Sequence, residues 1–261
     1  MNVFKSSADI VRLNNSNDWV DKLKIAGACV NETLKTISDI VKNNNVTTQD
    51  LETTFLEIAQ KHNCKPTFLG YKGFPGALCI SVNNELVHGI PGSYLIKDGD
   101  VVKIDVGATF DGAIADSAIT VICKDAKNKS HIELASLCRD ALVAGIKAIQ
   151  IGKQVGCIGY SINKKVQSSR FGLVTNYGGH AIQPNTPHAS PFIANKAQYN
   201  EGIRIQPGMT LCIEPMLTLD RDTKTIVKSD GWTVLTKSVA VHEEATVFVG
   251  EDEILTISSP L

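Results

Sequence analysis

The stretch that decides the fold runs from residue 101 to residue 120 and reads VVKIDVGATFDGAIADSAIT. Two apolar runs flank an Asp-Gly pair, which is a strong sequence signal for a β-hairpin. A loop centred on Phe110 and Asp111 would pair residues whose numbers sum to 221, so that Asp105 faces Asp116. A one-residue bulge in the loop would still leave these carboxylates directly or diagonally opposed.

Two carboxylates this close in apolar strands need a physical reason. Like charges repel, and in an apolar setting one of the two groups would have to take up a proton. A divalent metal ion between them removes that penalty. The hairpin alone leaves two alternatives open, a pair of acids that share a proton and two solvated residues on an exposed face of the sheet.

Composition limits the classes of function. The chain has 261 residues, of which 43% are hydrophobic and 20% charged, and a net charge of -1. No basic run points to nucleic acid or to a membrane surface as a partner. The start, MNVFKSSADIV, lacks the apolar core of a signal peptide, and no apolar stretch reaches the roughly 18 residues of a membrane-spanning helix. Seven cysteines without a C-x-x-C pair favour reduced thiols. We therefore expect a cytoplasmic protein.

The order of predicted elements repeats along the chain. Periodicity and capping signals predict helices at about 17 to 43 and from 47, strands at 78 to 83 and in the hairpin, a helix opened by a capping pattern at Ser130 to Glu133, a helix at about 157 to 168, and strands through to 249. This order predicts an α+β fold in one domain, made of two halves at about 17–125 and 130–256.

Two internal echoes support a duplication. The sequence IKDGDVVKID (96–105) aligns with IQPGMTLCIE (205–214), and VHGIP (87–91) aligns loosely with GHAIQP (179–184). Each half thereby delivers one carboxylate and one histidine, His88 or His180, in the same order. Similarity of this kind predicts a pseudo-twofold fold with a site on its axis.

Histidines and acids gather in the same segments. Four of the six histidines lie there, namely His88, His180, His188 and His242. In the run VAVHEEATVFV, alternation places His242 and Glu244 on one face of a strand and Glu243 on the other, so that only one of the two glutamates can face a site. The alternation does not decide which one.

A convergence of Asp105, Asp116, His180, Glu214 and Glu244 would give four carboxylates and one imidazole. That is too much negative charge for one ion, and two divalent ions fit it better. Such donors suit Mn, Fe(II), Co and Zn, and suit calcium less because imidazole is a poor ligand for that ion. Two ions about 3.5 to 4 Å apart would activate a water molecule for hydrolysis.

Several long motifs in order carry a family resemblance from about Asp21 to Thr256. They are FLGYKGFPGALCISVNNELVHGIPG, the hairpin, GGHAI, HxxP at 188 to 191, GMTLCIEPM, DGWTV and EEATVFVGEDEILT. The chain resembles the type I methionine aminopeptidases. The resemblance implies the pita-bread fold, a pseudo-twofold antiparallel sheet flanked by two pairs of helices. It implies a hydrolase that removes the N-terminal methionine from nascent polypeptides with two divalent metal ions, as a monomer and with the ribosome as a further partner.

The resemblance also assigns roles to residues. The implied metal ligands are Asp105, Asp116, His180, Glu214 and Glu244, with Asp116 and Glu244 bridging, which selects Glu244 over Glu243. Glu214 would take a proton from the attacking water, His188 would polarise the scissile carbonyl, and His88 would contact the scissile amide or the departing amine. The implied methionine pocket consists of Tyr71, Phe74, Cys79 and Trp232.

The chain departs from the family pattern without losing any of these ligands. It reads GHAIQ where the family usually reads GHGIG, and the stretch from His180 to His188 is one residue longer than usual. Pro187 replaces a customary phenylalanine, and His242 stands where glutamine is common. Two rival functions stay open, an X-Pro-type aminopeptidase of the same fold and a non-catalytic binding module of that fold.

Overall fold

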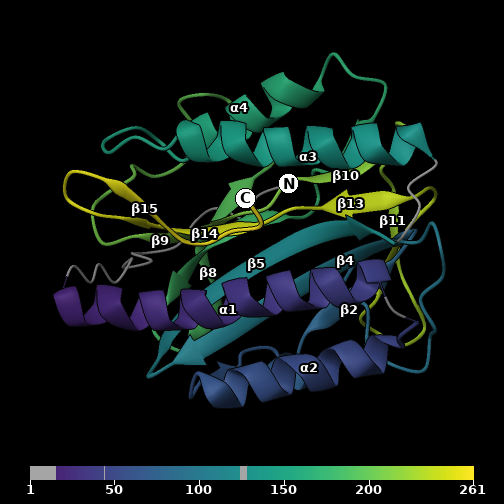
Figure 1. Ribbon diagram of the computed structural model, residues 1–261. Coiled ribbons are helices and arrows are strands. Elements are labelled where there is room, and N and C mark those ends of the chain that lie inside the picture. Colours follow the sequence, from purple (N-terminus) through teal and green to yellow (C-terminus); the bar gives the residue numbers. More distant parts are fainter. Residues whose placement is uncertain (1–15, 44, 124–127) are drawn as a thin grey trace.

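The computed structural model describes residues 16–43, 45–123 and 128–261, shown as ribbons in Figure 1. The N-terminal stretch in which we expect no targeting segment lies outside the described residues. The helices are α1 (Asn17–Asn43), α2 (Thr48–Lys61), α3 (Lys129–Lys147) and α4 (Gly156–Val166), with a short 3-10 turn η1 (Tyr71–Gly73). None of these helices is long and apolar enough to cross a lipid bilayer.

The strands of the first half are short except for the hairpin, and most strands of the second half are also short. They are β1 (Lys65–Pro66), β2 (Cys79–Val82), β3 (Glu85–Val87), β4 (Val101–Phe110), β5 (Ala113–Ile122), β6 (Gly172–Leu173), β7 (Gly178–Gln183), β8 (Thr186–Ala194), β9 (Thr210–Ile213), β10 (Met216–Thr218), β11 (Thr225–Val227), β12 (Val234–Thr236), β13 (Ala240–His242), β14 (Ala245–Val249) and β15 (Ile254–Ser258). All pairings among the described strands are antiparallel, and they form four hydrogen-bonded sheets.

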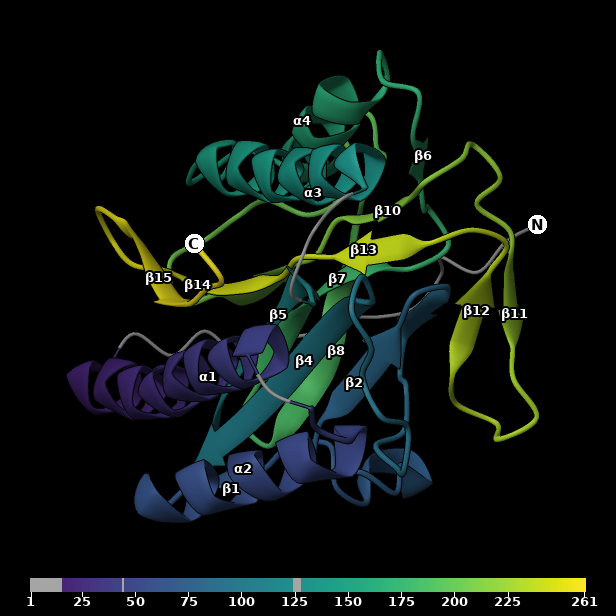
Figure 2. The same cartoon turned by 45° about the vertical axis from the view of Figure 1, so that its right-hand side comes forward.

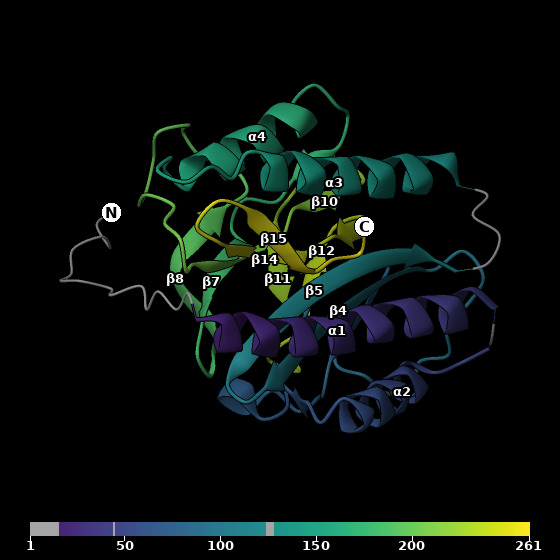
Figure 3. The same ribbon diagram turned by 60° about the vertical axis from the view of Figure 1, so that its left-hand side comes forward.

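Two pairs of helices enclose the strands from opposite sides. In Figures 1 and 3, α1 and α2 lie on one side, α1 across β4 and β5, and α3 and α4 lie on the other. Two large clusters of buried apolar side chains correspond to these layers, one under α1 and α2 and one under α3 and α4. The α+β class with antiparallel strands and two helix pairs is confirmed, while the duplication of halves stays a prediction.

The helix ends show which sequence signals were sound. A capping box opens α2, because the Thr47 side chain accepts a hydrogen bond from the Asp50 backbone and the Asp50 carboxylate accepts one from the Thr47 backbone. The capping pattern expected at Ser130 to Glu133 is wrong. Asn128 caps α3 instead, accepting a hydrogen bond from the Ser130 N–H, because an asparagine two residues earlier satisfies the free amide first.

The hairpin forms, but its register differs from the expected one. The loop consists of Asp111 and Gly112, whose φ angles of 45° and 84° suit a tight two-residue turn. Partner numbers therefore sum to 223, so Asp105 lies opposite Ala118 and Asp116 lies opposite Gly107. The expectation of a direct Asp105–Asp116 pair is wrong. The two carboxylates are diagonal neighbours on the same face of the hairpin.

Strand β5 joins the two halves along residues 242 to 246. Ala118 and Glu244 exchange backbone hydrogen bonds of 2.9 and 3.3 Å. On one side of that pair, the Thr120 hydroxyl bonds both the N–H and the carbonyl of His242. The single long strand expected over VAVHEEATVFV is instead two strands, β13 and β14, separated by Glu243 and Glu244. The break lies where the chain passes β5.

Candidate metal centre and active site

A cavity of about 270 Å³ is lined by residues from both the first and the second half of the sequence. This volume is below the about 300 to 1,000 Å³ typical of small-molecule sites, so the cavity suits a small occupant. It is lined by every residue that the sequence singled out for the metal site, for catalysis or for the methionine pocket, namely Tyr71, Phe74, Cys79, His88, Asp105, Asp116, His180, His188, Glu214, Trp232 and Glu244.

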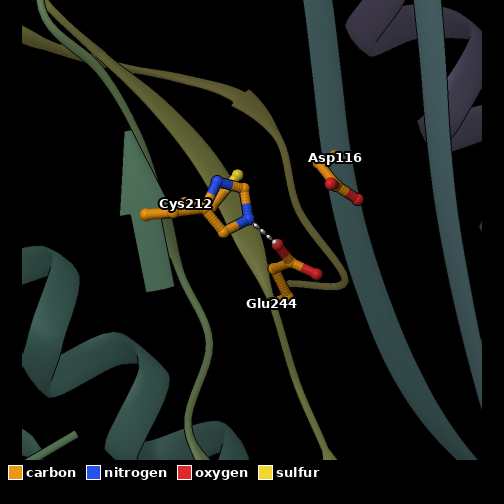
Figure 4. A group of neighbouring side chains, drawn as sticks. Asp116, Cys212 and Glu244 are labelled. Carbon is orange, nitrogen blue, oxygen red and sulfur yellow. Dashed lines mark ion pairs between the residues drawn. The ribbon is translucent and has the colours of Figure 1, made fainter. Parts of the chain in front are cut away.

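Five different backbone segments supply the acids and the imidazole expected to bind metal. Asp105 lies on β4, Asp116 on β5 and His180 on β7, while Glu214 directly follows β9 and Glu244 directly precedes β14. Their exposed fractions range from 2% to 9%. Figure 4 shows Asp116 and Glu244 on separate segments of the chain, near Cys212. Glu244 also forms an ion pair with His180.

Close backbone packing brings His180 to the carboxylates. A Cβ on the preceding Gly179 would lie 2.1 Å from the Cys212 carbonyl oxygen on β9, so only glycine allows the two strands to approach. The imidazole Nδ1 lies 3.2 Å from the Ala181 carbonyl, to which an Nδ1–H can donate. Its Nε2 then presents a lone pair toward Glu214 and Glu244, at 3.6 and 3.9 Å from their oxygens.

The electrostatics of this group of acids are unfavourable without a cation. Burial raises the pKa of Asp105 to about 6. Burial, followed by the charges of Glu244 and the other acids, raises the pKa of Asp116 well above its ordinary value. Burial likewise raises the pKa values of Glu214 and Glu244. Burial also lowers the pKa of His180 to about 4, so this imidazole is neutral and can ligate.

The buried donors fit divalent ions. Among the described residues, Asp105 Oδ1 and Asp116 Oδ1 are buried without a hydrogen-bond partner, which is costly unless a cation binds them. Donor atoms of Asp116, His180, Cys212 and Glu244 lie within 4.8 Å of one another, and so do those of Asp105, His242 and Glu244. The Cys212 thiol is a poor donor, because burial raises its pKa well above the ordinary value. The two groups share Glu244.

The structure separates the two neighbouring glutamates. Glu244 lines the cavity, whereas Glu243 does not. The Glu243 carboxylate lies 3.4 Å from the Arg139 guanidinium and accepts a hydrogen bond of 3.3 Å from the Thr120 N–H. Burial raises the pKa of Glu243 to about 8. Glu244 is therefore the glutamate whose side chain faces the cavity. Alternation in the sequence had left the choice between Glu243 and Glu244 open.

Two further histidines lie around the same space. His88 adopts a φ of 59° directly after β3, a left-handed backbone that is uncommon for histidine, and burial lowers its pKa to about 4. His188 lies on β8, with its ring centroid 4.5 Å from that of His180 and 5.2 Å from that of Tyr71. The register of β8 against β7 shifts between residues 186 and 189 and again between residues 189 and 192, and His188 lies within the first of these shifts. These shifts accommodate the additional residue while His188 still lines the cavity.

An apolar recess forms another part of the cavity. Phe68, Phe74 and Cys79 form a buried cluster, against which Trp232 packs. The Phe74 and Trp232 rings meet edge to face at 5.2 Å. Asp230 fixes the backbone before this tryptophan by accepting hydrogen bonds of 2.9 Å from the N–H groups of residues 232 and 233. Tyr71 contacts His188 at the mouth and lies outside this apolar cluster.

Sequence reasoning missed some of the lining. The missed residues are Lys72, Val87, Tyr177, Gly178 and Met216. Three of them had a signal in the sequence. Met216 is two residues after Glu214, and Tyr177 and Gly178 directly precede the Gly179-His180 pair, so proximity along the chain could have identified them. Lys72 reaches the cavity from the η1 turn, where its φ is 49°, and no periodic pattern marks such a position.

The family model for metallopeptidase family M24 matches residues 21–251 of the chain. The chain belongs to metallopeptidase family M24. Among M24 proteins it is 38% identical over 245 residues to a methionine aminopeptidase of Mycoplasma capricolum, covering 92% of this chain and 96% of that one. It is also 38% identical to a methionine aminopeptidase of Aquifex aeolicus, covering 88% and 92% of the two chains.

Solved M24 structures agree on the fold. A crystal structure of methionine aminopeptidase from Thermotoga maritima superposes with a TM-score of 0.91 at 34% identity, over 96% of this chain and 100% of that one. A prolidase of Pyrococcus furiosus superposes with a TM-score of 0.74 at 16% identity, and 66% of its length is covered. The latter likeness shows the shared pita-bread fold alone. The M24 chain described here has the fold and the relatives of a methionine aminopeptidase.

Proposed function

We propose that this M24 chain removes the initiator methionine from newly made polypeptides by hydrolysis at two divalent metal ions. The observation that carries the proposal is one cavity that combines four buried carboxylates and a neutral imidazole with an adjoining apolar recess. We further propose that it acts in the cytoplasm as a monomer, on nascent chains at the ribosome.

The residues proposed to hold the ions are the five that meet in the cavity. Glu244 belongs to both donor groups and Asp116 to the group of His180; both would be shared between the ions, with Asp105, His180 and Glu214 completing the set. When bound, the ions supply Lewis acidity toward the scissile carbonyl and lower the pKa of water. Mn, Fe(II), Co and Zn all suit these donors.

The other side chains are proposed to position the substrate and move protons. Glu214 would take a proton from the attacking water, and its carboxylate lies beside both His180 and His242, at 3.6 and 3.5 Å. His188 at the mouth would donate to the scissile carbonyl oxygen, and His88 would contact the scissile amide or the departing amine. The recess formed by Phe74, Cys79 and Trp232, with Tyr71 at its edge, receives the unbranched methionine side chain.

A peptide assay tests the activity. The metal-free full-length chain, supplied with Mn(II), Co(II), Fe(II) or Zn(II), should cleave Met-Ala-Ser and should leave matched Lys-Ala-Ser and Ala-Pro peptides nearly intact. Preferred cleavage before proline would instead assign the X-Pro-type activity. No cleavage with any metal would favour the non-catalytic module. A methionine released from Met-Ala-Ser and quantified by chromatography gives the readout.

The paired glutamates offer a matched test of the ligand assignment. Glu244→Gln removes one charge from the proposed bridging position, so the folded protein should retain much less metal, and Asp116→Asn should behave in the same way. Glu243→Gln replaces an equally buried carboxyl group one residue away, outside the cavity, and should keep both metal and activity. Metal content per folded chain, measured by mass spectrometry with circular dichroism as the folding control, decides. Equal metal retention in both glutamine variants would contradict the assignment.

A further inference from the structure

His242 faces the cavity but has no role in the proposed mechanism. It ends β13, and its backbone is fixed by two hydrogen bonds of 2.8 and 2.9 Å with the Thr120 hydroxyl. Its side chain is 1% exposed and lines the cavity. Among the described residues, neither ring nitrogen has a hydrogen-bond partner. Burying an imidazole with both nitrogens unsatisfied is costly, so its position calls for a partner that the protein atoms do not supply.

The distances around His242 mirror those around His180. His180 Nε2 lies 3.6 and 3.9 Å from the Oε1 atoms of Glu214 and Glu244. His242 Nε2 lies 3.5 and 3.8 Å from the Oε2 atoms of the same two glutamates. In each of the two glutamates, one carboxylate oxygen therefore lies nearer to His180 and the other nearer to His242. The glutamates lie between the two rings, with one oxygen turned to each side.

These distances fit a shared cation better than a direct hydrogen bond. Nitrogen-to-oxygen hydrogen bonds are about 2.7 to 3.2 Å long, which is shorter than any of the four separations. Two ligand atoms bound to one ion at about 2.0 to 2.2 Å lie about 3 to 3.5 Å apart. Donor atoms of Asp105, His242 and Glu244 all fall within 4.8 Å of one another. The arrangement is thus close to a coordination group that draws together slightly around an ion.

We propose that His242 is a sixth metal ligand, so that each ion of the pair binds one imidazole. His180 serves the ion on the Asp116 side and His242 serves the ion on the Asp105 side, with Glu244 common to both groups. The inference rests on the proposed two-metal site. An additional nitrogen donor makes the second position softer, which shifts its preference toward Co, Fe and Zn and away from Mn and Mg.

Counting imidazoles by X-ray absorption tests this directly. The full-length chain, freed of metal and loaded with two equivalents of Zn(II), should show an average of one imidazole per ion. His242→Gln supplies a side chain of similar length without an imidazole, and should halve the average number of imidazoles per ion. His62→Gln, which alters a histidine at the end of α2 outside the cavity, should leave the count unchanged. A wild-type average of one half, or an unchanged count in His242→Gln, would overturn the proposal.

Co(II) binding supplies an independent readout. The metal-free chain is titrated with Co(II) and followed by visible absorption and calorimetry. In His242→Gln the dissociation constant of the second Co(II) ion should be at least about tenfold larger than in the wild type, and that of the first ion nearly unchanged. Unchanged binding in both steps would contradict the ligand role, and thermal melts confirm that the variant is folded. Met-Ala-Ser cleavage is measured in parallel. If the wild-type chain cleaves the peptide but binds an average of only half an imidazole per Zn(II) ion, the sixth ligand alone is overturned. If it binds an average of one imidazole per ion but does not cleave the peptide, the proposed function alone is overturned.

Discussion

His188 is the catalytic candidate whose surroundings differ most from the family pattern. The additional residue before it and the neighbouring Pro187 could have turned the side chain away from the site. The register shifts of β8 absorb the change instead, and the imidazole contacts His180 and Tyr71 at the mouth of the cavity. A donor at this position stabilises charge that develops on the carbonyl oxygen only in the transition state.

Removal of His188 should therefore slow turnover and spare the metals. We expect His188→Ala to lower kcat by about 10² to 10³, as for loss of one donor to a developing oxyanion. Metal content and Tm should stay near the wild-type values, because His188 is not one of the proposed metal ligands. Steady-state kinetics on Met-Ala-Ser, with metal analysis of the same sample, provides the measurement. A near-normal kcat would show that another group polarises the carbonyl.

Trp232 is expected to set the preference for the first residue. Its ring closes the recess by packing edge to face on Phe74. Trp232→Ala should open that end, so that the ratio of kcat/KM for Met-Ala-Ser over Leu-Ala-Ser falls by about tenfold or more, the scale of a methylene-sized mismatch. A variant that loses activity on both peptides equally would place Trp232 outside the specificity pocket. Asp230→Asn, which keeps the ring, should shift the ratio less.

At the scale of elements, the hairpin turn controls where the acids of β4 and β5 lie. Gly112 has a φ of 84°, and a Cβ there would meet the Asn185 side chain at 3.1 Å. Gly112→Ala should therefore lower the free energy of unfolding by about 1 to 2 kcal/mol. Gly92→Ala, where the added Cβ meets open space and no left-handed φ is required, is the control and should change stability little. Urea unfolding of the metal-loaded proteins measures both, and equal effects would contradict the turn argument.

The same hairpin shows how far the sequence predicts the structure. Alternation and the Asp-Gly pair correctly predict two paired strands with both aspartates on one face. They miss the register by two, because the sum of partner numbers depends on which residues adopt positive φ. The choice between Glu243 and Glu244 likewise depends on Arg139 and Thr120, which approach from other elements. Patterns of neighbouring residues therefore predict the helices and strands and the kinds of side chain that could bind metal. The strand register, and which side chain faces the cavity, depend on contacts between residues that are distant in sequence.

At the scale of the whole molecule, the site lies between two apolar cores that meet along β5 and residues 242 to 246. Figure 2 shows β4, β5 and β13 converging on this region from both helix layers. Because each half contributes acids, repulsion among them opposes the closure of one half on the other. Divalent ions bound between the acids should offset that repulsion by attracting the carboxylates. They should thereby stabilise the entire fold, in addition to supporting catalysis.

Chelation should accordingly lower the melting temperature, and more so as pH rises. Burial raises the pKa of Asp105 to about 6 and that of Asp116 well above its ordinary value in the metal-free chain. The folded state then holds protons that the unfolded state has released above about pH 4, so metal-free stability falls as pH increases through the folded pKa values. Metal binding needs those carboxylates deprotonated and strengthens over the same range.

The gap between the melting temperatures of the loaded and metal-free forms should therefore widen steadily from about pH 5.5 to about pH 7.5. Free metal at a thousandfold its dissociation constant stabilises by about 4 kcal/mol, or about 10 °C for a chain of this size. Scanning fluorimetry with and without chelator across this range measures the gap, and Glu244→Gln should reduce it. A gap that stays constant or narrows with rising pH would show that the buried carboxylates are not the groups through which metal stabilises the two halves.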